Sequence, residues 1–169
     1  MNRTLTTPAP AILVVDDCPA CGALVNQAFR DVNSGYTLNF IDDGEKAIKY
    51  LRSASQDDAV VAPRVVLLDV NMPRLNGLEV LRELRADRFI SPLSVIMMTT
   101  SRLQRDVDEA YRWGANAYVV KPLELPGWER LLKSVVEFWL EFAEIPDHAY
   151  HNRHADSKRS PVLEESSDS

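Results

Sequence analysis

The sequence predicts an α/β fold, in which a parallel sheet carries helices on both faces. Five short apolar segments alternate along the chain with five segments in which apolar residues recur at helical spacing. That alternation is typical of parallel strands joined by crossover helices. The clearest strand runs from Val65 to Asp69, an apolar run between Pro63 and Pro73. Such a run suits a strand buried on both faces.

The other strands are predicted from shorter runs of the same kind. AILVVDD begins the ordered part of the chain and ends in two acids, and a fourth run ends in the hydroxyl residues TTS. Proline, glycine, asparagine and aspartate bound several of these runs, as expected at strand ends. We therefore expect strands at 11–17, 36–41, 65–69, 93–98 and 117–120.

Apolar residues at helical spacing predict the connecting helices. Pro19 suits a first helical turn, and the stripe after it stops at Asn33-Ser34-Gly35. Asp42-Asp43-Gly44 is interpreted as a turn before the second helix, which Ala47, Ile48 and Leu51 mark. The third helix is expected at 75–87. The fourth is expected after a Ser101 cap, with Leu103, Val107, Ala110 and Tyr111 in one stripe before Gly114, and the fifth from Pro122 to about 144.

Composition indicates one globular domain with a polar segment at each end. The chain has 169 residues, of which 46% are hydrophobic, enough for one ordinary core. Residues 1–10 are polar and carry two prolines, and residues 145–169 have little apolar content and scattered charge. We expect a disordered N-terminal arm at 1–10, a globular domain at 11–144 and a disordered C-terminal tail at 145–169.

Charge and hydropathy exclude several classes of partner. The formal net charge of −6 argues against a nucleic-acid surface, which needs clustered lysine and arginine. The N-terminus has no signal-peptide core, and no apolar run approaches the length of a membrane span. We expect a cytoplasmic protein that binds neither nucleic acid nor membrane.

Polar groups gather at the predicted strand ends. Asp16 and Asp17, Asp69, Thr99 and Lys121 follow four of the five strands. The carboxyl ends of parallel strands lie at one edge of a sheet, so these side chains are expected to converge. Three carboxylates held together repel one another, and a hard cation such as Mg²⁺ relieves that repulsion. A carboxylate can also act as a nucleophile toward phosphorus.

These segments closely resemble the receiver domains of two-component response regulators. The matching segments are VVDD in the first strand, LLDVNMP followed by Asn76-Gly77, TTS after the fourth strand and GANAYVVKP at 114–122. The resemblance implies a flavodoxin-like sheet of order 2-1-3-4-5. It implies that Asp69 is the phosphoacceptor, and that Thr99 and Lys121 hold the phosphoryl oxygens. It also implies a Mg²⁺ site formed by Asp17, Asp69 and the backbone carbonyl of Asn71, with Asp16 acting mostly through water, and a switch formed by Thr99 and Tyr118.

Two further groups of residues fall outside that pattern. Cys18 and Cys21 form a CxxC at the start of a helix, where thiols can become reactive. Because Asp16 and Asp17 disfavour a thiolate, we prefer two ordinary turn residues over a redox pair. His148, His151 and His154 have a spacing that could bind a transition metal, but we prefer solvated tail side chains.

The fifth helix is more apolar than one buried face requires. Leu131, Val135, Phe138 and Phe142 form one stripe, and Leu132, Val136, Trp139 and Ala143 form an adjacent one. We predict a symmetric homodimer through the fourth helix, the fifth strand and the fifth helix, with Leu132, Val136, Trp139, Phe138 and Phe142 at its face. The alternative is that the C-terminal segment folds back over the second stripe.

The ending VEFWLEFAEIP also resembles stand-alone response regulators of bacterial and cyanobacterial phytochromes. That resemblance implies a phytochrome histidine kinase as the partner that phosphorylates Asp69. We therefore expect a signalling switch and not a turnover enzyme. Two alternatives stay open: a binding module that works without phosphorylation, and a phosphatase of the haloacid dehalogenase type. That phosphatase family needs a second acid where this chain has Asn71.

Overall fold

The computed structural model describes residues 11–32, 35–57, 60, 62–100 and 102–144. The two segments expected to be disordered, 1–10 and 145–169, lie outside this part of the chain. A single five-stranded parallel sheet has the order β2-β1-β3-β4-β5, as predicted. The strands are β1 (Ala11–Val15), β2 (Thr37–Ile41), β3 (Pro63–Asp69), β4 (Ser94–Thr99) and β5 (Ala117–Val120).

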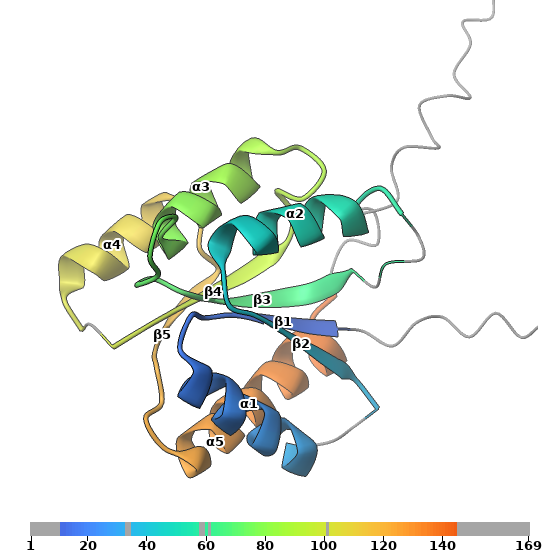
Figure 1. The fold of residues 1–169 in the computed structure, drawn as a ribbon, viewed down its shortest axis with the longest axis vertical. Coiled ribbons are helices and arrows are strands. Elements are labelled where there is room, and N and C mark those ends of the chain that lie inside the picture. The colour runs from blue at the N-terminus through green and yellow to red at the C-terminus, as the bar shows by residue number, and fades with distance from the viewer. Residues whose placement is uncertain (1–10, 33–34, 58–59, 61, 101, 145–169) are drawn as a thin grey trace, which may run out of the picture.

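Helices cover both faces of the sheet, so the predicted doubly wound architecture is confirmed. They are α1 (Pro19–Val32), α2 (Gly44–Ala54), α3 (Gly77–Ala86), α4 (Gln104–Arg112), α5 (Leu125–Val135) and a π-helix, η1 (Val136–Phe142). Figure 1 shows α1 and α5 side by side on one face, with α2, α3 and α4 on the other. No helix in the described ranges is long and apolar enough to cross a membrane.

The core is divided between the two faces by the alternation of side chains along each strand. In β1, Ile12 and Val14 join the cluster under α1 and α5, while Leu13 and Val15 join the cluster under α2 and α3. All four side chains are fully buried. Because successive residues of a strand point to opposite faces, a continuous apolar run is what a strand between two helical layers requires.

The starts of α2, α3 and α4 differ from the prediction. Asp43, interpreted as part of a turn, is the N-cap of α2 and accepts the backbone N–H of Lys46. Helix α3 begins at Gly77, two residues later than predicted, because Asn76 forms a capping box with Glu79. The expected cap Ser101 lies outside the described residues, and Leu103 occupies the N-cap position of α4.

The end of the last helix differs from the regular α-helix that we expected. After Val135 the chain forms the π-helix η1, and the backbone N–H of Ala143 donates to the carbonyl of Phe138, five residues earlier. A π-helix has wider turns than an α-helix. Of the stripe that a period of 3.6 residues predicts, Val135 at the end of α5 is buried, whereas Phe138 and Phe142 of η1 are exposed.

The predicted dimer face is wrong for two of its residues. Leu132 and Val136 are 0% and 3% exposed and lie in the domain's own core, where they pack with the face that α1 and α5 cover. Trp139 is half-buried against the same cluster. The exposed aromatic residues are Phe138 and Phe142, at 56% and 78% exposure. These two are also residues of the predicted dimer face.

Candidate functional site

Backbone hydrogen bonds continue the sheet just past its carboxyl edge and place the polar groups there. The Asp16 N–H donates to the Ile41 carbonyl at 3.0 Å, and the Lys121 N–H donates to the Thr99 carbonyl at 2.8 Å. The N–H of Val70, directly after Asp69, donates to Met98. The strand ends are thus held in register, and the side chains that follow them meet.

The three predicted carboxylates form one cluster. Asp16, Asp17 and Asp69 each offer an oxygen, and these oxygens all lie within 4.8 Å of one another. Asp16 and Asp69 are buried, whereas Asp17 is exposed. Asp16 Oδ2 accepts no hydrogen bond of normal geometry from the described residues. Hard oxygen donors with a spare buried lone pair fit a divalent cation.

Lys121 is the cation that compensates this cluster. Its Nζ lies 2.6 Å from Asp16 Oδ2 and 3.3 Å from Asp69 Oδ2, and the side chain is 9% exposed. Burial acts to lower the pKa of Lys121, but the close contact with Asp16 and the charges of Asp69 and Asp16 outweigh it, so the pKa is raised. Lys121 therefore keeps its positive charge at neutral pH.

Asp69 is held in an environment that disfavours its charge. Burial raises the pKa of Asp69 to about 6; Lys121 acts to lower it, while the negative charge of Asp16 raises it. The backbone N–H of Asn71 also donates to the carboxylate and acts to lower the pKa. A second cation at this edge would therefore be attracted by the carboxylate charge that Lys121 alone does not neutralise.

Gly77 is a site residue whose role sequence reasoning missed. A Cβ added there would lie 2.1 Å from the backbone carbonyl oxygen of Asp69. The start of α3 therefore packs directly against the Asp69 backbone, and the Gly77 N–H donates to the Val70 carbonyl at 2.9 Å. The Asn76-Gly77 pair is the sequence signal for this close approach, but on its own it predicts only a turn.

Thr99 connects the acidic cluster to β5. It is 1% exposed at the end of β4, and the side-chain amide of the exposed Asn71 donates to its Oγ1 at 3.3 Å. Tyr118 lies beside it, with a buried hydroxyl that has no hydrogen-bond partner of normal geometry in the described chain. Burial raises the pKa of Tyr118, Thr99 opposes the rise, and Asp106 on α4 adds to it.

A second missed contact holds the loop between β3 and α3. Arg74 has a φ of 66°, in the left-handed region, and its guanidinium forms an ion pair with the buried Asp43. The Asp43 carboxylate therefore caps α2 and anchors the loop that carries Asn71. Sequence spacing gave no sign of this pairing, because the two residues are 31 positions apart.

The two cysteines lie next to the acidic cluster. Both are free and partly exposed, and Cys18 Sγ accepts the N–H of Cys21 at 3.4 Å. Burial raises the pKa of the Cys21 thiol to about 11, and the hydrogen bond with Cys18 and the charge of Asp16 act in the same direction. A thiolate is disfavoured, in agreement with the expectation. His148, His151 and His154 lie outside the described residues.

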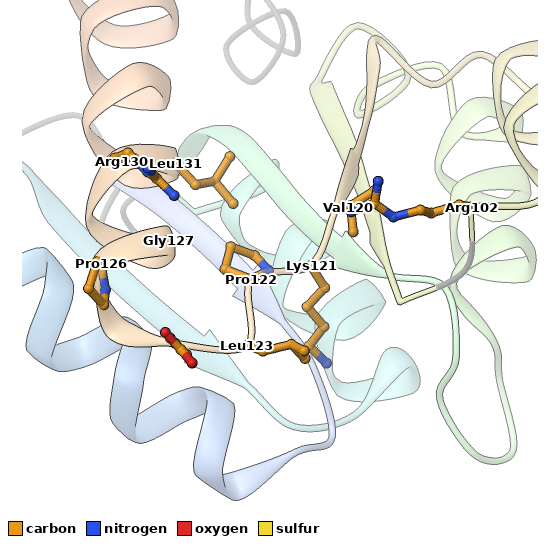
Figure 2. A pocket seen from close by; sticks show the side chains of 10 residues that line it. Arg102, Val120, Lys121, Pro122, Leu123, Pro126, Gly127, Arg130 and Leu131 are labelled. Carbon is orange, nitrogen blue, oxygen red and sulfur yellow. The ribbon is translucent and has the colours of Figure 1, made fainter.

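A surface pocket of about 560 Å³ opens beside Lys121, between the loops that follow β4 and β5. Figure 2 shows Pro122 and Leu123 on the β5–α5 loop, with Arg102 on one side and Arg130 of α5 on the other. Leu123 is 81% exposed and Val120 is 41% exposed. The pocket thus joins an apolar surface to two guanidinium groups, close to the acidic cluster.

Comparison with known proteins identifies the family. The model of the response regulator receiver domain matches residues 12–135, which include all of the polar groups at the sheet edge. The chain belongs to the receiver domain family of response regulators. Receiver domains are phosphorylated by histidine kinases, and the observed sheet order is the one that the resemblance implies.

Three relatives resemble this chain over most of its length. Response regulator Rcp1 of Synechocystis is 28% identical in sequence, over 83% of this chain and 96% of the Rcp1 chain. The structure of its Mn²⁺-bound form aligns with a TM-score of 0.70, over 81% of this chain and 99% of the chain in that structure. The phosphorylated cyanobacterial phytochrome response regulator RcpA is 30% identical, with a TM-score of 0.73 over 82% of this chain and 99% of its own. RPA3017, a response regulator in red light signalling of R. palustris, is 34% identical, with a TM-score of 0.73 over 81% of this chain and 98% of its own.

Proposed function

We propose that this protein is a single-domain response regulator that accepts a phosphoryl group on Asp69 from a histidine kinase. The observation that carries the proposal is the position of the Asp69 carboxylate, within 4.8 Å of Asp16 and Asp17 and 3.3 Å from the ammonium group of Lys121. A phosphoryl group on Asp69 would bring three further oxygens into reach of these groups. Positioning and charge neutralisation are what phosphoryl transfer requires.

The transfer forms one bond and breaks one. An Asp69 carboxylate oxygen attacks phosphorus, the bond from phosphorus to the imidazole nitrogen of the donor breaks, and the imidazole leaves as neutral histidine after taking a proton from solvent. Lys121 pairs with a phosphoryl oxygen, and the Thr99 hydroxyl donates to another. The three histidines of the sequence, at 148, 151 and 154, lie outside the matched domain, and the proposed donor is the phosphohistidine of a kinase or a small acyl phosphate.

The acidic cluster would hold Mg²⁺ through Asp16, Asp17, Asp69 and the Asn71 carbonyl. When bound, the ion supplies positive charge that offsets the negative charge of the phosphoryl oxygens. Two features support a divalent cation: the cluster of three carboxylates, two of them buried, and the Mn²⁺-bound structure of the relative Rcp1. The choice of Mg²⁺ among hard cations follows from its common use in phosphoryl transfer.

We propose that the change caused by phosphorylation is passed to a partner through the face that α4, β5 and α5 form. Thr99 and Tyr118 connect the acidic cluster to this face, since the buried Tyr118 hydroxyl lies beside Thr99. Leu103 and Tyr111 of the α4 segment are about half exposed, at 53% and 50%. A homodimer through this face would use Phe138, Phe142 and the exposed part of Trp139, and would leave the buried Leu132 and Val136 inside each protomer.

A phytochrome histidine kinase is the proposed source of the phosphoryl group. The relative RcpA is a cyanobacterial phytochrome response regulator, and RPA3017 acts in red light signalling. This chain covers nearly the whole of both solved structures, with 30% and 34% identity. Transfer from a light-activated phytochrome kinase should be faster than transfer from an unrelated sensor kinase; equal rates would remove the phytochrome assignment but not the phosphorylation itself.

Labelling with radioactive acetyl phosphate and Mg²⁺ tests the site directly. The full chain should take up about one label per molecule, and Asp69→Asn should take up none. Asp42→Asn is the matched control, because Asp42 is an exposed acid on the neighbouring β2–α2 loop that pairs with Lys46. Uptake by Asp69→Asn equal to that of the unmodified protein would overturn the assignment. Continuous turnover of a phosphomonoester would instead indicate a phosphatase.

A further inference from the structure

Two thiols at the start of α1 lie beside the acidic cluster and have no part in the proposed phosphoryl transfer. Cys18 directly precedes α1, and Cys21 lies in its first turn. The sulfurs of Cys18 and Cys21 and a carboxylate oxygen of Asp16 all lie within 4.8 Å of one another. Both cysteines are free and partly exposed, so small solutes can reach them.

Local structure explains the positions of the cysteines only in part. Cys18 Sγ accepts the N–H of Cys21 at 3.4 Å, which is the interaction of a helix N-cap. Serine, aspartate and asparagine make that interaction better, because sulfur is a weak acceptor. Cys21 packs against the core cluster under α1 and α5, where a small apolar residue would also serve. Neither role requires two sulfurs converging on one carboxylate.

Asp16 is the residue that this group shares with the acidic cluster. It is fully buried, and its Oδ1 accepts the N–H of Cys18 at 2.9 Å. Its Oδ2 accepts no hydrogen bond of normal geometry from the described chain, although Lys121 Nζ lies 2.6 Å away. Asp16 therefore belongs to two groups of donors, one with the oxygens of Asp17 and Asp69 and one with the sulfurs of Cys18 and Cys21.

We propose that Cys18, Cys21 and Asp16 bind a thiophilic divalent cation such as Zn²⁺, at a second site that shares Asp16 with the acidic cluster. In tetrahedral zinc sites the Zn–S distance is about 2.3 Å and the Zn–O distance about 2.1 Å, which places the donor atoms roughly 3.5 to 3.8 Å apart. The three donors therefore need to approach by about 1 Å, which side-chain rotation on the first helical turn supplies. Water completes the coordination.

Binding involves no change of oxidation state. Each thiol releases its proton to solvent as its sulfur coordinates the cation, so two protons leave for each ion bound. Thiolate donors select zinc and its heavier analogues, whereas the carboxylates of the acidic cluster suit Mg²⁺. The two sites therefore differ in which ion they take, although they share one carboxylate.

Sharing Asp16 has a consequence that rests on the proposed function. An ion held by the cysteines engages Asp16 and withdraws it from the cluster that would neutralise the phosphoryl oxygens. Micromolar Zn²⁺ should therefore slow labelling of Asp69 by acetyl phosphate in the presence of Mg²⁺. The same ion should leave labelling unchanged in Cys18→Ser/Cys21→Ser, which keeps the acidic cluster intact.

Cadmium is a suitable probe, because a bond between cadmium and sulfur gives an ultraviolet charge-transfer band that carboxylates and imidazoles do not give. The full chain is titrated with Cd²⁺ under a phosphine reductant, which keeps both thiols reduced. One Cd²⁺ per chain should produce the band. Histidines of the tail cannot produce it.

Three variants give the readout its specificity. Cys18→Ser preserves an N-cap acceptor, so the fold is retained while one sulfur is lost, and Cys21→Ser removes the other. Each should weaken Cd²⁺ binding at least roughly tenfold, the loss that even outer partners of a metal site produce. Asp16→Asn should weaken binding while the band persists. Circular dichroism verifies that each variant is folded.

The possible outcomes separate this site from the proposed function. No band in the unmodified chain, or the same Cd²⁺ affinity in the double cysteine variant, overturns the sulfur site. An unchanged affinity in Asp16→Asn overturns the shared carboxylate. Asp69→Asn should keep the band; if that variant were still labelled by acetyl phosphate, the proposed phosphoacceptor would fail while the sulfur site would stand.

Discussion

The ammonium group of Lys121 lies closer to Asp16, at 2.6 Å, than to Asp69, at 3.3 Å. In this arrangement Lys121 compensates the carboxylate that is fully buried and makes a longer contact with the proposed phosphoacceptor. A cation that binds Asp16 would weaken the shorter contact and release Lys121 toward Asp69. Lys121 therefore links occupancy of the acidic cluster to the charge beside the proposed phosphoryl group.

Lys121→Met is expected to destabilise the metal-free protein by about 3 kcal/mol at neutral pH, because it leaves two buried carboxylates without their cation. Although burial opposes it, pairing with Asp16 and Asp69 raises the pKa of Lys121 above its usual 10.5. The stabilising contribution is therefore complete below pH 10.5 and is lost only as the pH rises through the higher folded-state value. Urea unfolding in a chelator measures it. Lys133→Met, at an exposed position of α5, should change stability little.

Asp69→Asn is expected to stabilise the metal-free protein. Burial and Asp16 raise the pKa of Asp69 from 3.8 to about 6, despite Lys121, so the folded state binds a proton more tightly than the unfolded chain. The resulting stabilisation is complete below pH 3.8 and is lost as the pH rises through about 6. At pH 7.5 the charged carboxylate destabilises the fold by roughly 3 kcal/mol, at about 1.4 kcal/mol per pKa unit.

The pH dependence provides the check for Asp69. The difference in unfolding free energy between Asp69→Asn and the unmodified protein should grow from pH 4.5 to pH 7.5 in a chelator. Addition of Mg²⁺ should reduce this difference, because the cation stabilises the carboxylate and not the amide. A difference that stays constant across this range would show that the Asp69 charge is not disfavoured in the folded protein.

Gly77→Ala should disturb the site through sterics alone. The added Cβ would lie 2.1 Å from the Asp69 carbonyl oxygen, so the start of α3 or the end of β3 must move. We expect a loss of at least about 2 kcal/mol, as for overpacked cores, and weaker labelling at Asp69. Gly35→Ala is the comparison: nothing lies within 4 Å of its added Cβ, and only its φ of +83° is unfavourable, at about 1 kcal/mol. Equal losses for both variants would contradict the close packing at Gly77.

The sheet and the strand-end cluster could be predicted because their signals are local and repeated. Each strand is a short apolar run, and Asp16, Asp69, Thr99 and Lys121 each follow such a run directly. In a parallel sheet, that position alone brings the side chains to one edge. The geometry of the cluster thus follows from the topology, and the topology follows from the order of the runs.

The contacts that escaped prediction depend on backbone geometry or on distant pairs. Arg74 pairs with Asp43 from a loop between β3 and α3 in which Arg74 itself has a positive φ. A positive φ is not predictable from the sequence at an arginine. The change from α5 to the π-helix η1 leaves the apolar spacing of the sequence unaltered while it rotates the side chains. Leu132 and Val136, which the second apolar stripe predicts at the dimer face, are instead buried in the domain's own core, whereas Phe138 and Phe142 of the same predicted face are exposed.

Exposure distinguishes two residues that the predicted dimer face groups together, Leu132 and Phe142. Phe142→Ser removes an aromatic side chain that is 78% exposed, so the unfolding free energy should change by less than about 0.5 kcal/mol. Leu132→Ala removes a fully buried side chain and should destabilise the domain by about 2 to 5 kcal/mol. If a homodimer forms through this surface, sedimentation should show weaker self-association for Phe142→Ser than for Leu132→Ala at a temperature where both are folded. Weaker association for Leu132→Ala alone would place the interface elsewhere.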